Sequence, residues 1–387
     1  MPPKEKQTLA EVIPAAKRAV VKEIQPPEED KTLLHLLRFI IVAAIVVVFG
    51  LIFVAWGTYS EGWQNYFVES VYRVVPYPAA SVGYGNWITI ADYNENAKAI
   101  RRFLENREAA SGGGKFDFST ADGLKELAII KKNVLTQLVD NKIIEVLAKQ
   151  QGITVSNAEL EETTNKILDR DGKRAENIAQ LNSLYNWEPK DFKERVIKNL
   201  LYEQKLEDKI KASGELDKDI KEKVAAVSSK LASGEDFSEV AKNYSESPSK
   251  QYGGLLPSFS REDAPSAFAN QAFSMKQGEI SLPIESEEGW HFIKIERKFQ
   301  EGGKDKVEIR HIVLLKKTLQ DWLQEKKKEF RVHVFLKPYH WHDQVGKLYF
   351  KDDSLNKLEQ EQSRNSLEEK LQQADFLLNV NKNTPKK

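Results

Sequence analysis

An uninterrupted apolar run near the N-terminus constrains this chain more than any other feature. From Phe39 to Trp56 the sequence reads FIIVAAIVVVFGLIFVAW, eighteen residues without a charge. With the leucine-rich residues 33–37 in front, it is long enough for a membrane-spanning helix. A cleavable signal peptide has a shorter apolar core and a short basic start, whereas about thirty polar residues precede this run. We therefore expect an uncleaved transmembrane helix at 33–56, rather than a signal peptide or a buried core helix.

The charges that flank the run predict its orientation. Seven basic residues precede it: Lys4, Lys6, Lys17, Arg18, Lys22, Lys31 and Arg38. Residues 57–98, which follow it, carry only Arg73 and Lys98. Because basic residues stay on the cytoplasmic side of a membrane, we expect a single-pass protein with a cytoplasmic N-terminus and its main domains outside the cytoplasm.

Composition excludes several kinds of chemistry. Lys+Arg and Asp+Glu both number 58, so the formal net charge is zero and the basic excess of a nucleic-acid binder is missing. The chain has no cysteine, which excludes disulfides, thiolate zinc sites and cysteine nucleophiles. No Gly-rich phosphate loop is present, and we expect neither a cofactor nor a metal.

Residues 57–218 are expected to form a mainly helical domain after a disordered tail at 1–32. A strand and turn are predicted at 76–93, and helices over 122–212, where apolar residues recur at helical spacing. Ser156 and Glu159 have the spacing of a capping box, which predicts a helix start. No catalytic cluster occurs in this part, so its apolar stripes are interpreted as core.

Four stretches carry a resemblance to known families. VLTQLVDNKIIEVLAKQQGITVSNAELEE (134–162) is similar to the N-terminal chaperone region of secreted, parvulin-type foldases. GEDFSEVAKNYS (234–245), SAFANQAFSMKQGEIS (266–281) and EEGWHFIKI (287–295) resemble, in order and spacing, a parvulin peptidyl-prolyl isomerase domain. The resemblance implies an α+β fold in which a parvulin (FKBP-like) antiparallel-sheet domain at 219–317 follows the helical domain.

The strand that should open the parvulin domain does not occur before the first of these parvulin-like segments. The family's first strand carries a histidine followed by aliphatic residues, and here RHIVLL (310–315) lies after the last strand. The family's first and last strands are neighbours, so a hairpin could join them. We expect a circular permutation with the first strand at 307–315; a second, truncated parvulin repeat is the alternative.

Charge pairing predicts a register for that hairpin. If His291 faces His311, then Lys294 meets Glu308 and Glu296 meets Lys306, so the charged pairs have opposite sign. The turn would then be Gln300-Glu301-Gly302. The register shifted by two residues sets Lys294 against Arg310 and separates the histidines, so it is disfavoured.

The resemblance also implies which residues form the site. His291 and His311 would be paired imidazoles, Ser247 would stand where the family carries Cys or Asp, and the substrate-binding residues would be Leu256, Ala264, Phe268 and Trp290. Ser247, Ala264 and the stretch Leu255–Pro257 depart from the family pattern, which leaves activity open.

The C-terminal part is less informative. Residues 318–350 are expected to form a helix and a strand that pack back on the folded part, and 351–387 a polar flexible tail. His333, His340 and His342 could bind a metal ion, but a strand is the plainer interpretation.

These features together predict a foldase in the bacterial plasma membrane. It would bind unfolded secreted polypeptides, isomerise their X-Pro bonds, and contact the lipid bilayer through residues 33–56. An inert parvulin frame that serves as a holdase or binding module is the alternative, and an anchor that recruits a partner is a third.

Overall fold

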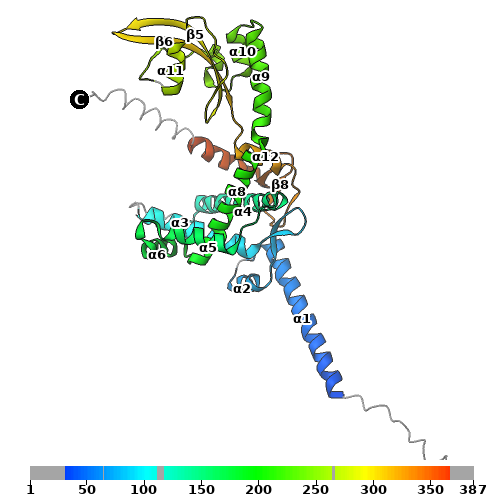
Figure 1. The fold of residues 1–387 in the computed structure, drawn as a ribbon. Helices are drawn as coiled ribbons and strands as arrows, with labels where there is room; N and C mark the ends of the chain where they lie inside the picture. Colours follow the sequence, from blue (N-terminus) through cyan, green and yellow to red (C-terminus); the bar gives the residue numbers. More distant parts are fainter. Residues whose placement is uncertain (1–30, 64, 111–116, 264–265, 367–387) are drawn as a thin grey trace, which may run out of the picture. The chain divides into compact units, whose positions relative to one another are not determined.

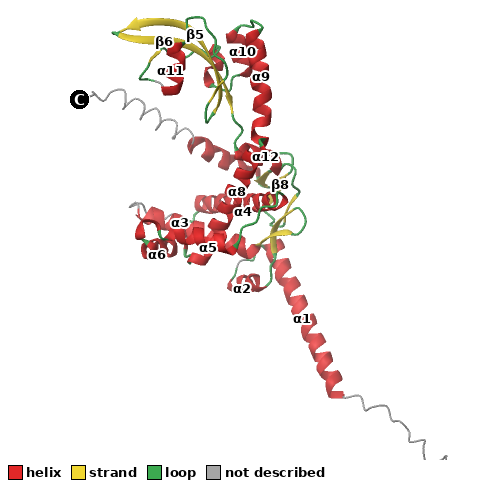
Figure 2. Ribbon diagram, in the orientation of Figure 1, coloured by secondary structure: helices red, strands yellow, loops and turns green. Residues whose placement is uncertain are grey.

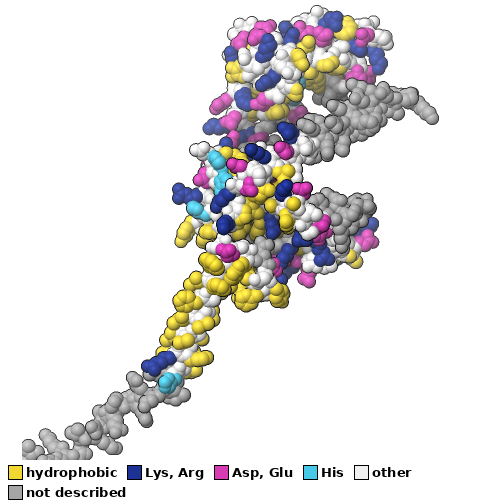
Figure 3. All heavy atoms as spheres, turned by 180° about the vertical axis from the view of Figure 1, so that it is seen from behind, with side chains coloured by type: hydrophobic (Ala, Val, Ile, Leu, Met, Phe, Trp, Pro, Cys, Tyr) yellow, Lys and Arg dark blue, Asp and Glu magenta, His cyan; other side chains and the backbone are white. Residues whose placement is uncertain are grey.

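The computed structural model describes residues 31–63, 65–110, 117–263 and 266–366, and the chain divides into two compact units, 1–70 and 71–387. Most of the tail expected at 1–32 therefore lies outside the described residues. In the first unit, α1 (Lys31–Glu61) is covered with apolar side chains along most of its length (Figure 3). Its His35–Glu61 part is long and apolar enough to cross a membrane, and its most apolar window is only 6% buried.

The helical part of the second unit is built around one long helix, α4 (Ala121–Gln150). Thr120 caps it by accepting a hydrogen bond from the Gly123 N–H, and Leu135, Val139 and Ile143 on its inner face are fully buried. It packs against α3 (Ile90–Ala110) and α8 (Lys198–Ser213) (Figure 1). Helix α6 (Arg174–Tyr185) packs in turn on α3 and contacts α5 (Asn157–Leu168) and α7 (Pro189–Phe192). The predicted capping box at Ser156 and Glu159 is present at the start of α5.

The chain's C-terminal segment adds elements to this helical part. It contributes α12 (Leu319–Lys327), β7 (Val332–Val334), β8 (Tyr339–His342) and β9 (Lys347–Phe350). Strand β7 pairs with β1 (Pro78–Val82), which also pairs with β2 (Asn86–Thr89), so segments 250 residues apart share one sheet.

Two partly buried ion pairs join this segment to α4. Lys327 Nζ lies 2.8 Å from Asp140, and Lys132 Nζ lies 2.6 Å from Glu359. Glu359 belongs to a helical stretch at 353–366. The expected tail at 351–387 is thus partly helical as far as it is described.

The remaining part is an antiparallel sheet covered by helices on both faces, which confirms the α+β class. Its strands are β3 (Phe259–Ser260), β4 (Ile284–Glu285), β5 (Gly289–Glu301) and β6 (Lys304–Leu315), in the order β3-β6-β5-β4. The two long strands, β5 and β6, lie side by side (Figure 2). One face packs Phe292, Ile312 and Leu314 against α9 (Lys218–Ala232) and α10 (Phe237–Tyr244). The other packs Ile293, Ile295 and Ile309 against α11 (Ser266–Ser274) and Met275.

Strand β6 lies next to β5, as predicted for the moved strand, and is a central strand of the sheet. It pairs with β5 along its whole length and with β3 on its other side, in the same sheet rather than in a second repeat. It starts at Lys304, three residues earlier than expected.

The predicted register of the β5–β6 hairpin is wrong. Ile293, not His291, lies opposite His311, and Lys294 lies opposite Arg310. A bulge at Glu296 offsets the repulsion between Lys294 and Arg310. The Glu296 carboxylate accepts a hydrogen bond from Arg310 Nε at 3.0 Å and lies 3.4 Å from Lys294 Nζ, so it bridges the two cations. Beyond the bulge Arg297 meets Glu308, so opposite charges still face each other.

The predicted three-residue turn is also wrong. Glu301 pairs with Lys304, which leaves Gly302 and Gly303 as a two-residue turn with φ values of 58° and 76°. Both values lie in the left-handed region, which a two-residue turn of this kind requires at both positions and which glycine adopts without strain.

Candidate active site

Two histidines form the centre of the candidate site. His291 Nδ1 and His311 Nε2 are 2.9 Å apart and share a hydrogen bond, with the ring planes only 10° from parallel. The side chains meet diagonally across β5 and β6, on the face that α11 covers. The expected imidazole pair is therefore present although the register differs.

An apolar wall lies beside the pair. The Phe268 ring on α11 makes T-shaped contacts with both imidazoles, with its centroid 5.4 Å from that of His311 and 6.5 Å from that of His291. Leu256 and Phe259 are half-buried in the same cluster. Phe268 and Leu256, two of the expected substrate-binding residues, thus lie in one apolar cluster beside the histidine pair, and Phe259 extends it.

Ser286, which was not predicted from the sequence, extends the histidine pair into a row of three hydrogen-bonded polar side chains. Ser286 Oγ lies 2.7 Å from His291 Nε2 and accepts from the Gly289 N–H at 3.2 Å. The row Ser286–His291–His311 can run in either direction: each imidazole donates through one nitrogen and accepts through the other. A serine five residues before the histidine, in the short loop that leads into β5, was the available signal.

Ser247 lies in a loop that reaches β6 through the backbone. Its hydroxyl is 3.0 Å from Ser249 Oγ and accepts from the Ser249 N–H. The Ser249 carbonyl accepts from Gly254, whose carbonyl accepts from the His311 N–H at 2.9 Å. The loop therefore positions the histidine strand, while the Ser247 hydroxyl is engaged within the loop itself.

Two expected substrate-binding residues do not join this group. Trp290 packs with Phe292 and Leu314 on the opposite face of the sheet, because neighbouring residues of a strand point to opposite sides. Its assignment to the substrate site is therefore wrong. Ala264 lies outside the described residues.

Burial keeps both imidazoles neutral near pH 7. Desolvation lowers the pKa of His311 to about 4, with a smaller contribution from His291. Desolvation also lowers the pKa of His291, against the opposing effect of the Glu288 carboxylate. A neutral pair can donate and accept hydrogen bonds in one row, which two imidazolium ions cannot.

The lowered pKa of His311 predicts a pH-dependent stability. Between pH 6.5 and 4 the unfolded chain protonates this histidine while the folded chain does not, so the free energy of unfolding falls as pH drops. The loss should reach about 3 kcal/mol and be absent above pH 6.5. Hydrogen exchange of the β5 and β6 amides, recorded in increasing urea at several pH values, measures this loss in the free energy of unfolding.

The control for this experiment is a matched pair of variants. His311→Asn should remove most of the slope between pH 6.5 and 4, whereas His340→Asn, at an exposed position, should leave it unchanged. Equal slopes in the wild type and His311→Asn would contradict the assignment.

The other histidines do not gather into a metal centre. His340 and His342 contact the Tyr349 ring from the β8–β9 hairpin, and His333 lies in β7. Within the part of the chain that the structure describes, no three His, Cys, Asp or Glu side chains are placed to hold a metal ion.

Comparison with known proteins agrees with this architecture. A SurA-like N-terminal domain matches residues 33–206, and a PPIC-type PPIase domain matches 203–297, so the second match ends before β6. Foldase protein PrsA of Caldanaerobacter subterraneus is 30% identical over 238 residues, covering 55% of this chain and 71% of that protein.

Of two further relatives, one is named a foldase and the other a chaperone. Foldase protein PrsA of Bacillus subtilis is 33% identical over 194 residues, 44% of this chain and 61% of that protein. Chaperone SurA of Hahella chejuensis is 25% identical over 243 residues, which cover 52% of this chain and 56% of that protein.

A SurA-like helical domain joined to a parvulin domain defines a chaperone-type foldase. The chain belongs to the family of PrsA foldases, and its sheet domain is of the parvulin peptidyl-prolyl isomerase type.

Proposed function

We propose that this protein is a membrane-anchored foldase that isomerises X-Pro bonds in unfolded secreted polypeptides outside the cytoplasm of a bacterium. The observation that carries the proposal is the hydrogen-bonded pair His291–His311 beneath the edge of Phe268. It combines an apolar wall for a proline ring with neutral polar groups beside it.

Isomerisation needs no covalent step. The barrier of about 20 kcal/mol comes from amide resonance, and a site lowers it by binding the twisted amide better than either planar form. Phe268 and Leu256 would hold the ring through apolar contact. The row Ser286–His291–His311 would fix the polar wall beside the carbonyl, and Ser247 would position the loop that supports it.

The proposed location rests on α1 and its flanking charges. An exposed apolar helix is stable only where lipid or protein covers it, and α1 is exposed along its apolar window. The basic residues before it and their scarcity after it favour a cytoplasmic N-terminus.

A second candidate function is that of a holdase without turnover. It is favoured by a cavity of about 770 Å³ in the helical part, which lies outside the parvulin domain. Client binding at this cavity is also compatible with isomerase activity, because the cavity and the histidine site share no residue.

Prolyl exchange in a short Ala-Pro peptide, followed by NMR with the full chain in lipid nanodiscs, tests the enzymatic proposal. We expect acceleration by the wild type and loss of most of it in His291→Ala, since the polar row is then broken. Folding of the variant is checked by hydrogen exchange. A folded wild type that does not accelerate exchange would leave only the holdase.

A further inference from the structure

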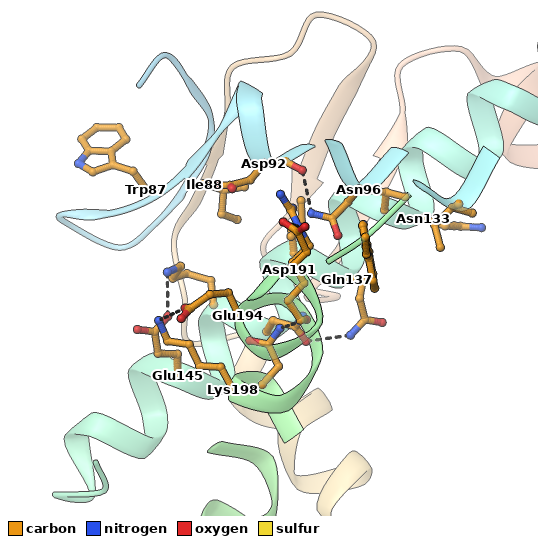
Figure 4. Close-up of a pocket in the computed structure, with 18 of the residues that line it drawn as sticks. Trp87, Ile88, Asp92, Asn96, Asn133, Gln137, Glu145, Asp191, Glu194 and Lys198 are labelled. Carbon is orange, nitrogen blue, oxygen red and sulfur yellow. Dashed lines mark hydrogen bonds and ion pairs between the residues drawn. The ribbon is translucent and has the colours of Figure 1, made fainter. Parts of the chain in front are cut away.

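The cavity in the helical part has walls from three segments (Figure 4). They are the residues around the start of α3, the middle of α4, and residues 187–199, which run from α7 into α8. Its volume of about 770 Å³ lies in the range of ligand sites. Part of the third wall, Lys193–Ile197, is a π-helical turn, a rare geometry that is frequent at functional sites.

A row of side-chain amides lines the α4 wall. Asn133, Gln137 and Asn141 are spaced by four residues, so they share one face of the helix. Gln137 Nε2 donates to Asn141 Oδ1 at 2.9 Å, and no side-chain hydrogen bond of Asn133 occurs within the described part of the chain. The row thus retains donors and acceptors for a ligand.

The spacing of this row matches an extended polypeptide. Four residues of α-helix advance about 6 Å, and two residues of an extended chain advance about 6.7 Å. Backbone groups on one edge of an extended chain recur every two residues, so consecutive amides on α4 can meet consecutive groups on that edge. Each amide offers a carbonyl and N–H groups, as a peptide bond does.

The other lining groups do not select for a charged ligand. The cavity is lined by four carboxylates and four cations, several of them paired, such as Glu145 with Lys142 at 2.8 Å and Glu194 with Lys198 at 3.5 Å. A phosphate or nucleic-acid site would carry a basic excess. Trp87 and Trp187 add apolar surface without further charge.

We propose that this cavity binds extended polypeptide through its backbone, with the row Asn133–Gln137–Asn141 as the element that pairs with the main chain. The inference rests on the proposed function in that the ligand is an unfolded client. It assigns recognition to groups that every polypeptide shares, which explains how one site accepts clients of different sequence and without proline.

The test uses the full chain in nanodiscs and a fluorescein-labelled, proline-free peptide of about twelve residues, extended in solution. Binding is measured by fluorescence anisotropy, with a second peptide that has the same side chains but N-methylated backbone amides. The variant is Asn133→Ala/Gln137→Ala/Asn141→Ala. The control is Gln150→Ala, an exposed amide on α4 outside the cavity.

We expect the triple variant to lose affinity about tenfold or more, and the N-methylated peptide to bind the wild type as weakly. Gln150→Ala should bind normally, and the triple variant should keep wild-type prolyl exchange in the Ala-Pro peptide. Peptide binding without exchange activity would overturn the enzymatic proposal alone and support this one.

Three results would overturn the inference. They are unchanged binding by the triple variant, equal binding of the methylated and unmethylated peptides, and a wild type that binds no peptide. A wild type that binds chitohexaose in place of the peptide would assign the cavity to saccharides.

Discussion

Replacing Phe292 with alanine is expected to lower the free energy of unfolding of the parvulin-type domain by about 3–5 kcal/mol. The ring is 1% exposed and lies at the centre of the cluster that joins the sheet to α9 and α10. Its removal deletes apolar contact and leaves a cavity that the surrounding strands fill only in part. Hydrogen exchange of the β5 and β6 amides in increasing denaturant measures the change.

The matched control is Phe299→Ala in the same strand. Phe299 is only partly buried near the hairpin end, and the guanidinium carbon of Arg297 lies 4.4 Å from its ring centroid. We expect it to cost about 1 kcal/mol or less. Similar losses in both variants would contradict the position of Phe292 in the core.

Gly254→Ala is expected to destabilise the domain by about 2–4 kcal/mol and to disturb the histidine pair. Gly254 has a φ of +80°, and a Cβ atom there would lie 2.5 Å from the His311 carbonyl oxygen. The loop must therefore move away from β6, breaking the bond from the His311 N–H to the Gly254 carbonyl. The histidine ring resonances in the NMR spectrum report the displacement, and thermal unfolding reports the loss.

Gly234→Ala separates the cost of backbone strain at a positive φ from the cost of the close approach to β6. Gly234 has a similar φ of +85°, but a Cβ atom there would meet nothing within 4 Å. Its replacement should cost only the backbone strain, about 1 kcal/mol, and should leave the histidine resonances unchanged. Equal effects of the two substitutions would refute the close approach of the loop to β6.

The sequence predicted the elements better than their pairing. Helical spacing and the capping box at Ser156 placed the helices, and the histidine-aliphatic pattern of 310–315 placed a strand. The register depended on the bulge at Glu296, where one extra residue changes every later pairing. Cross-strand charges are too weak to reveal such a bulge, but the adjacent Gly302 and Gly303 could have indicated the two-residue turn.

The candidate site was predicted in part, through family resemblance. His291, His311, Phe268 and Leu256 do lie together. Trp290 could have been excluded from the sequence, because a residue next to His291 in a strand points to the other face. The cavity in the helical part could not have been predicted, since segments far apart in the sequence form its walls.

The most direct test of the account compares prolyl exchange in the Ala-Pro peptide for the wild type, Phe268→Ala and Trp290→Phe. Loss of the Phe268 contact should lower kcat/KM about 10- to 100-fold, whereas Trp290→Phe, on the opposite face, should retain wild-type exchange. This result would place catalysis on the histidine face of the sheet. A folded wild type without acceleration, or equal losses in both variants, would contradict it.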